Sequence, residues 1–153
     1  MTMLPLATVA RIVSMSAVWI FSGCGVERCD DGVDTALRPA VVSFLSWARS
    51  ERLLPLRGTQ GDVCSATVTS LSAPTLGTCY TTGGFNYLKI DSGLLGDSRL
   101  ETVVWHELTH CLYQLGHDSE PNRVMSAGLS PALMSKSPSQ RRDELADYIR
   151  ESL

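Results

Sequence analysis

All three histidines of this 153-residue chain fall within one twelve-residue window, from His106 to His117. The window begins with His-Glu-Leu-Thr-His, the pattern H-E-x-x-H. On a helix, residues i and i+4 lie one above the other on the same face, so His106 and His110 can bind one metal ion. Glu107 lies beside that face, where its carboxylate can accept a proton from metal-bound water. The pattern predicts a helix with a metal site; the alternative is two surface histidines on an amphipathic helix.

A third ligand requires the chain to turn back after this helix. His117 lies eleven residues after His106, which on a straight helix is about 16 Å along the axis. Gly116 is expected to end the helix, because glycine readily adopts the left-handed conformation found at helix C-termini. His117 could then reach the metal. Three acidic residues are alternative third ligands: Asp118, Glu120 and Glu144.

The residues after His117 read Asp-Ser-Glu-Pro-Asn-Arg-Val-Met-Ser. With H-E-x-x-H, this order resembles the metzincin zinc peptidases, the matrixins especially, in which a glycine, a third histidine, often an acid–proline pair, and a methionine in a tight turn follow the motif. Met125 lies eight residues after His117, where matrixins have that methionine. One departure is that the family has its third histidine one residue earlier and a glycine where this chain has Tyr113. A residue inserted before Gly116 accounts for the difference.

The resemblance covers roughly residues 85–153 and is specific only at 106–126. It implies one α+β domain over residues 33–153: a reduced metzincin-like catalytic domain with a small twisted sheet packed on helices, an active-site helix, the methionine turn and a C-terminal helix. It also implies a zinc-dependent endopeptidase. In that enzyme three histidines would hold Zn²⁺, Glu107 would be the general base, and Met125 would support the metal site from below. The three ligands would be His106, His110 and His117.

Two other functions remain open. A lipid-anchored binding or structural protein could keep zinc for stability, although structural zinc sites usually have four protein ligands. A gluzincin-type hydrolase would use Glu144 or Glu120 as its third ligand.

The first 23 residues are expected to be a signal peptide. The ten-residue apolar stretch 12–21 is too short to span a bilayer but suits the hydrophobic part of such a peptide. Residues 21–24, Phe-Ser-Gly-Cys, resemble a bacterial lipobox, in which the cysteine, here Cys24, is lipidated and becomes the mature N-terminus. A plain signal peptide or an internal hydrophobic segment is the alternative. Residues 24–32 would be a tether, and the protein a monomer that is exported and anchored in the cell envelope, or otherwise secreted.

Four cysteines remain after Cys24, and an even number in an exported chain indicates two disulfides. Cys64–Cys79 is the most local of the possible pairings and would join two neighbouring strands. Cys29–Cys111 is then left, which would tie the N-terminal segment to the back of the active-site helix. Cys111 is a poor metal ligand, because it follows His110 and points about 100° away around the helix.

The remaining elements follow from periodicity and turn residues. Helices are expected over 33–52 and over 138–151. The active-site helix is expected to begin near Asp97 or Ser98, either of which could cap it, with Glu101 placed for a capping box. Strands are expected over 63–71, 79–82 and 85–91. The resemblance implies that strand 85–91 forms the rim of a cleft and pairs with an extended substrate; the alternative is a plain edge strand. A net charge of −3 without a basic block disfavours nucleic acid as a partner. The resemblance implies a peptide or protein substrate as the partner.

Overall fold

The computed structural model describes residues 32–53, 63–82 and 85–153, and of Cys64 only the backbone. The predicted signal peptide with Cys24, nearly all of the predicted tether, and Cys29 lie outside these residues. In the described part, no helix has both the length and the apolar character needed to cross a membrane.

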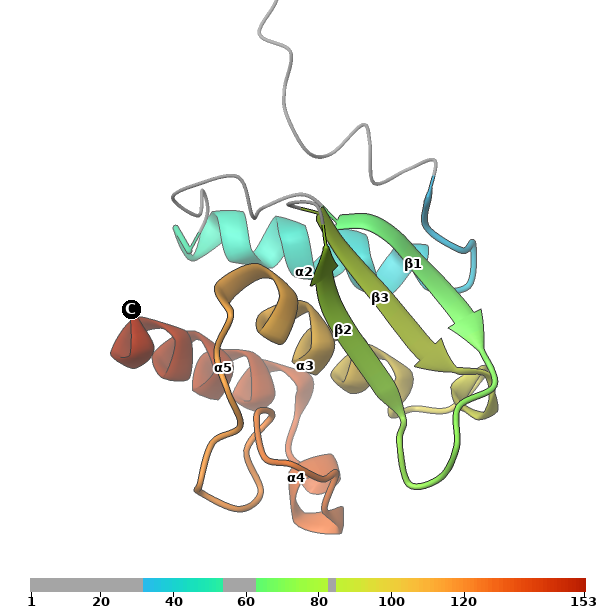
Figure 1. Ribbon diagram of the computed structural model, residues 1–153. Helices are drawn as coiled ribbons and strands as arrows, with labels where there is room; N and C mark the ends of the chain where they lie inside the picture. Colours follow the sequence, from blue (N-terminus) through green and yellow to red (C-terminus); the bar gives the residue numbers. More distant parts are fainter. Residues whose placement is uncertain (1–31, 54–62, 83–84) are drawn as a thin grey trace, which may run out of the picture.

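The fold is α+β, as predicted, with a small sheet and several helices (Figure 1). Strand 85–91 has the predicted bounds, and the last helix extends one residue further than predicted. The short helix α4 follows Ser130, whose hydroxyl accepts from Leu133 N–H as an N-cap, and was not predicted. The elements in chain order are α2 (Arg38–Ser50), β1 (Val63–Thr69), β2 (Gly77–Thr82), β3 (Phe85–Asp91), the 3₁₀ helix η1 (Ser92–Leu94), α3 (Leu100–Tyr113), α4 (Pro131–Ser135) and α5 (Pro138–Ser152).

The sheet has the strand order β1-β3-β2, with β1 parallel and β2 antiparallel to β3. Strand β3 is therefore central, and both of its edges are already hydrogen-bonded. The expectation that residues 85–91 form the rim and pair with a substrate is wrong. Within the described residues, β2 is the edge strand next to helix α3 (Figure 1).

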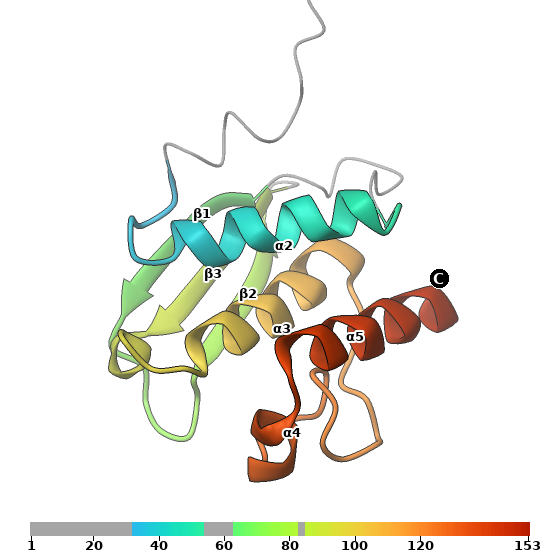
Figure 2. The same cartoon turned by 180° about the vertical axis from the view of Figure 1, so that it is seen from behind.

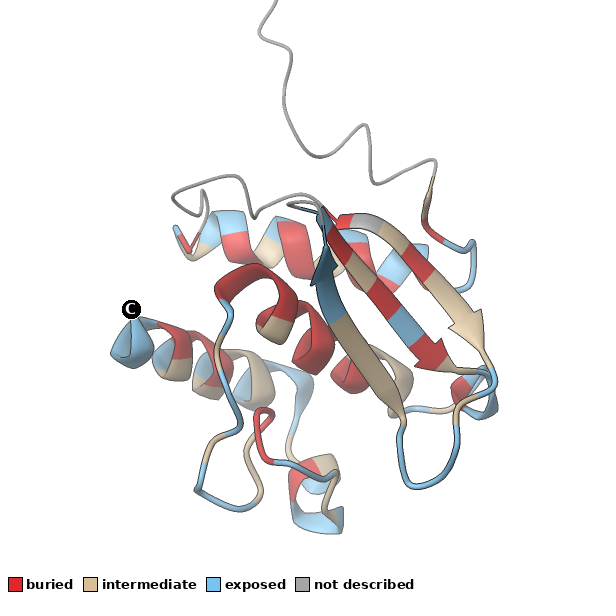
Figure 3. Cartoon of the chain, in the orientation of Figure 1, coloured by how far each residue is buried: buried red, intermediate tan, exposed pale blue. Residues whose placement is uncertain are grey.

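Side chains of β3 alternate between the two faces of the sheet. Asn86, Leu88 and Ile90 are buried towards the helices, whereas Tyr87 stacks on Tyr80 of β2 on the outer face, with ring centroids 5.3 Å apart. Figure 3 shows this alternation as bands of buried and exposed residues along the strand. Burial along β3 therefore has a period of two, as in a strand with one face towards the core.

Helices α2 and α3 lie next to each other on one side of the sheet, where α3 packs against strands β2 and β3, with α5 alongside (Figures 1 and 2). Trp105 shows this packing, since its ring lies 5.3 Å from that of Phe44 and 4.8 Å from that of Trp47. The predicted apolar stripe on α3 is too narrow, because neighbours on several sides bury most of the helix. Its buried residues are Thr102, Val103, Val104, Trp105, His106, Glu107, Leu108, Thr109, Cys111, Leu112 and Tyr113.

The start of α3 differs from the prediction. The helix begins at Leu100, Arg99 occupies the N-cap position, and no side chain caps the helix. The Asp97 carboxylate accepts a hydrogen bond from the Arg99 backbone N–H at 2.8 Å, but Asp97 lies two residues before the N-cap position. Glu101 forms no capping box because it pairs with Arg142 of α5 at 3.1 Å.

Candidate metal centre

The three histidines converge on one point. The possible ligand atoms of His106, His110 and His117 all lie within 4.8 Å of one another. The Nε2 atoms of His106 and His110 are 2.9 Å apart, and the ring of His117 lies 4.8–5.2 Å from the other two. His106 is buried, His110 half-buried and His117 exposed. Three imidazoles in this arrangement can hold a metal ion.

Backbone carbonyls orient the two helical imidazoles. His106 Nδ1 lies 2.6 Å from the Val124 carbonyl oxygen, and His110 Nδ1 lies 2.6 Å from that of Leu115. A carbonyl oxygen only accepts hydrogen bonds, so each Nδ1 carries the proton. In a neutral imidazole the other nitrogen, Nε2, then has a lone pair and no hydrogen.

This protonation state makes the short contact between the two Nε2 atoms informative. Burial lowers the pKa of His106 to about 4 and also lowers the pKa of His110, so both rings are neutral at pH 7. Two lone pairs that face each other at 2.9 Å without a proton between them repel. A shared cation removes that repulsion, and Nδ1–H donated to a carbonyl is the usual second contact of a metal-binding histidine. The donor set therefore fits a metal ion.

Helix α3 ends two residues before Gly116, the residue expected to end it. Gln114 adopts the left-handed conformation, with φ 54° and ψ 32°, and its N–H donates to the His110 carbonyl. The described backbone has only Gly96 among its glycines at positive φ, so Gly116 does not make this turn. Ending the helix at Gln114 brings the Leu115 carbonyl to His110 Nδ1, a contact that no local propensity encodes. The chain then returns to place His117 beside the other two histidines.

The predicted methionine turn is a tight turn. The Ser126 N–H donates to the Arg123 carbonyl at 3.1 Å, and Met125 between them is 1% exposed. The Met125 carbonyl accepts from the Asp118 N–H at 2.8 Å, next to His117 in the chain. With the Val124 carbonyl on His106, this turn supports the segments that carry two of the three histidines.

Glu107 is buried beneath the edge strand β2. Its side chain approaches Gly77 so closely that a Cβ atom on Gly77 would lie 2.7 Å from Glu107 Cγ and 3.0 Å from Oε1. Burial raises the pKa of Glu107 to about 7, and the hydrogen bond from the Cys79 backbone N–H opposes this rise. The carboxylate is thus held in place by β2, and it can exchange a proton near neutral pH.

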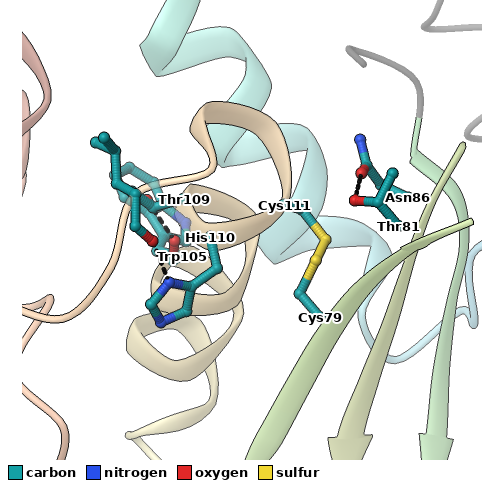
Figure 4. Close-up of a disulfide and its surroundings, with 8 residues drawn as sticks. Cys79, Thr81, Asn86, Trp105, Thr109, His110 and Cys111 are labelled. Atoms are coloured by element: carbon teal, nitrogen blue, oxygen red, sulfur yellow. Dashed lines mark hydrogen bonds between the residues drawn. A yellow bond between two sulfur atoms is a disulfide. The ribbon is translucent and has the colours of Figure 1, made fainter. Parts of the chain in front are cut away.

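The disulfide differs from both predicted pairings. Cys79 of β2 is bonded to Cys111 of α3, with 5.6 Å between their Cα atoms (Figure 4). The predicted pairings Cys64–Cys79 and Cys29–Cys111 are therefore both wrong. The physical reason is the strand order, which places Cys79 against α3. As expected, Cys111 leaves the helix in a different direction from His110 (Figure 4).

The acidic alternatives lie outside the histidine cluster. Glu144 pairs with the Lys136 ammonium at 2.7 Å, and Asp118 pairs with Arg123 at 3.2 Å. Glu120 contributes its backbone to the turn, accepting from the Ser126 hydroxyl at 2.8 Å. Among the residues that the structure describes, no aspartate, glutamate or cysteine joins the three histidines as a possible ligand.

A groove with a cavity volume of about 500 Å³ opens beside the site. Two of the histidines and Glu107 line it, together with Arg99, which the sequence analysis missed. The signal for Arg99 was its spacing of seven residues before His106, two helical turns along one face. The lining residues are Pro74, Thr75, Leu76, Gly77, Arg99, Val103, His106, Glu107, His117, Ser126, Ala127, Gly128 and Leu129.

No protein-family model matches this chain, and no curated protein or solved structure is significantly similar to it. The resemblance to metzincins consequently remains an expectation drawn from residues 106–126. A proposal for the function therefore rests on the residues of the site and on their geometry.

Proposed function

We propose that the protein is a zinc-dependent endopeptidase. The observation that carries this proposal is the convergence of three imidazoles beside a buried carboxylate that is not one of the possible ligands. A site that served only stability would gain from closing around the metal with four protein ligands. Here the site has three ligands, and two of them, His106 and His117, lie with the adjacent Glu107 on the wall of a groove, which favours catalysis.

Zinc suits this donor set. His106 and His110 present neutral nitrogen donors, and tetrahedral zinc with three histidines keeps one position for water or substrate. Zn²⁺ bound by these histidines would polarise a carbonyl group and lower the pKa of a water toward ~7. The carbonyls of Val124 and Leu115 would hold the first two imidazoles in the required tautomer.

Glu107 is proposed as the general base. Its carboxylate would accept a proton from the attacking water and then return that proton to the leaving amine of the cleaved peptide. The Cys79 N–H and the absence of a side chain at Gly77 would hold the carboxylate at its position. Main-chain contacts restrict the carboxylate to few rotamers, which would keep it in the geometry needed for proton transfer.

The edge strand β2 is proposed as the partner of an extended peptide substrate. It begins at Gly77, beside Glu107, and its one sheet neighbour in the described residues is β3. Residues 80–82 at its far end are exposed. A peptide that adds to this edge would run past Glu107 with its backbone hydrogen-bonded, which is a common mode of peptide recognition.

Hydrolysis by matched variants tests the proposal. The zinc-loaded protein is incubated with a broad peptide mixture, and the products are identified by mass spectrometry. Glu107→Gln should lose at least about 100-fold in rate, since general-base catalysis contributes that much. Glu101→Gln removes a carboxylate from the same helix outside the groove and should keep the parent rate. Undiminished cleavage by Glu107→Gln would contradict the mechanism, and no cleavage by the parent would contradict the function.

A further inference from the structure

We infer that Arg99 binds a carboxylate of the substrate, either an acidic side chain or a free C-terminus. This selectivity rests on the proposed function, because it assigns a substrate class to the same groove. Arg99 is the one lysine or arginine among the described residues that line the groove. The other charged side chain there, apart from the histidines, is Glu107 at the proposed catalytic end.

Arg99 shares a helix face with the site. It occupies the N-cap of α3 with helical backbone angles, φ −80° and ψ −17°. At about 100° per residue, Arg99, Val103 and His106 lie within roughly 60° of one another around the axis. All three line the groove, so the cavity follows this face of the helix.

The spacing along the helix gives the position of the bound carboxylate. Seven residues at 1.5 Å place Arg99 about 10 Å from His106 along the axis, and helical side chains lean further towards the N-terminus. An extended peptide advances about 3.3 Å per residue. The carboxylate that Arg99 binds is therefore about three residues from the cleaved bond.

Asp97 holds the guanidinium in a fixed orientation. Its carboxylate accepts from Arg99 Nε at 3.0 Å and from Nη2 at 2.7 Å. This pairing raises the pKa of Arg99, so the group stays charged. In the described part of the chain, Nη1 makes no hydrogen bond, and the side chain is 42% exposed. An arginine fixed along one edge and open along the other is suited to bind a carboxylate.

Apart from the zinc proposed at the histidines, the described residues of the groove offer no competing attraction for an anion. Most of the wall between Arg99 and the histidines is apolar or small. The whole chain has a net charge of −3, so an acidic peptide gains nothing from its general field. A carboxylate held by the zinc would keep its advantage in a variant without Arg99, whereas a carboxylate held by Arg99 would lose it.

Calorimetry on the zinc-loaded Glu107→Gln protein tests this inference without cleavage. In the first series, an apolar peptide with an amidated C-terminus carries one Glu at each position in turn, and each peptide is paired with the same peptide carrying Gln. The second pair is the apolar peptide alone, with either a free or an amidated C-terminus. In at least one of these pairs, we expect the peptide with the carboxylate to bind about tenfold more tightly than its neutral match. The Glu scan reports a side chain, and the second pair reports a C-terminus.

Three further substitutions in that background complete the test. Arg99→Gln should abolish the discrimination, and Arg99→Lys should retain part of it by keeping the charge. Arg49→Gln removes an exposed charge from α2 and should change nothing. Equal binding of all matched pairs, or unchanged discrimination in Arg99→Gln, would overturn the inference. Because binding is measured without hydrolysis, a parent protein that cleaves nothing would count against the proposed function only.

Discussion

Gly77 of strand β2 packs directly against the side chain of Glu107 on helix α3, so that a Cβ atom at position 77 would lie 2.7 Å from Glu107 Cγ. Real Cβ atoms do not approach a neighbour so closely, so any side chain at position 77 must displace Glu107 or the strand. A glycine in an edge strand next to the site thus has a packing role that a general base requires.

Replacing Gly77 with alanine should lower the rate of peptide hydrolysis about tenfold or more, because misplaced catalytic groups lose proximity. Zinc affinity should be unchanged, since the three histidines are untouched. Steady-state kinetics with parallel zinc titration measure both effects. Ser46→Ala is the control, because Ser46 is an exposed residue of α2 that does not line the groove. Equal kcat values for the two variants would contradict the packing role of Gly77.

The Cys79–Cys111 disulfide should contribute to stability because it closes a long loop. With a sequence separation of 32 residues, loop-closure entropy predicts a loss of about 3–4 kcal/mol in the free energy of unfolding when both are replaced by alanine. Urea unfolding of the two proteins measures this difference. Peptide mapping without reduction should find Cys79 linked to Cys111; a linked peptide containing Cys79 and Cys64 would refute the pairing.

Metal-free protein should show a pH dependence that is specific to Glu107. Its pKa in the folded state is raised from 4.5 to about 7, so burying its ionised form costs stability that the protonated form does not cost. Stability from this group is present below pH 4.5 and is lost as the pH rises towards 7. Glu107→Gln cannot ionise and should gain on the order of 3 kcal/mol relative to the parent between pH 4.5 and pH 8.

Urea unfolding with a chelator, at several pH values, measures that gain. His106 has the opposite effect, because its pKa is lowered to about 4 and its contribution is lost as the pH falls from 6.5. This contribution is common to both proteins and cancels in their difference. If the difference in free energy of unfolding between Glu107→Gln and the parent stays constant from pH 4.5 to pH 8, the pKa of Glu107 is not raised in the folded protein.

The lipid anchor is a prediction of sequence alone. A Cys24→Ser variant should leave the membrane fraction and appear in the soluble fraction, because several acyl chains are needed for persistent anchoring. Fractionation followed by detection of the chain measures this change. If the variant sediments with the membrane as the parent does, or if the parent itself is found free in the medium, the anchor is wrong.

The sequence predicted the local parts of the structure well. The H-E-x-x-H spacing brings His106 and His110 to one face because helix geometry depends only on neighbouring residues. Strand 85–91 was found because Gly83-Gly84 separates two strand-like runs, and such a turn signal is local. The tight turn around Met125 was expected from the resemblance and closes through a hydrogen bond between residues three apart.

Features that depend on strand order could not be predicted. Nothing near Cys79 in the sequence shows that β2 lies at the sheet edge against α3, so its bond to Cys111 was missed. The same arrangement buries α3 on several sides, which an apolar stripe does not reveal. Gln114, in place of Gly116, adopts the left-handed conformation that ends the helix, and the turn brings the Leu115 carbonyl to His110 Nδ1, a contact that the sequence does not reveal.

The zinc affinity of His117→Ala tests the central claim, a three-histidine centre with Glu107 outside it. Competitive titration with a chromogenic chelator should find one Zn²⁺ per chain in the parent and in Glu107→Gln. His117→Ala should bind zinc at least about tenfold more weakly, because one of three nitrogen ligands is lost. Zinc affinity equal to the parent in His117→Ala, or lost in Glu107→Gln, would contradict this account of the site.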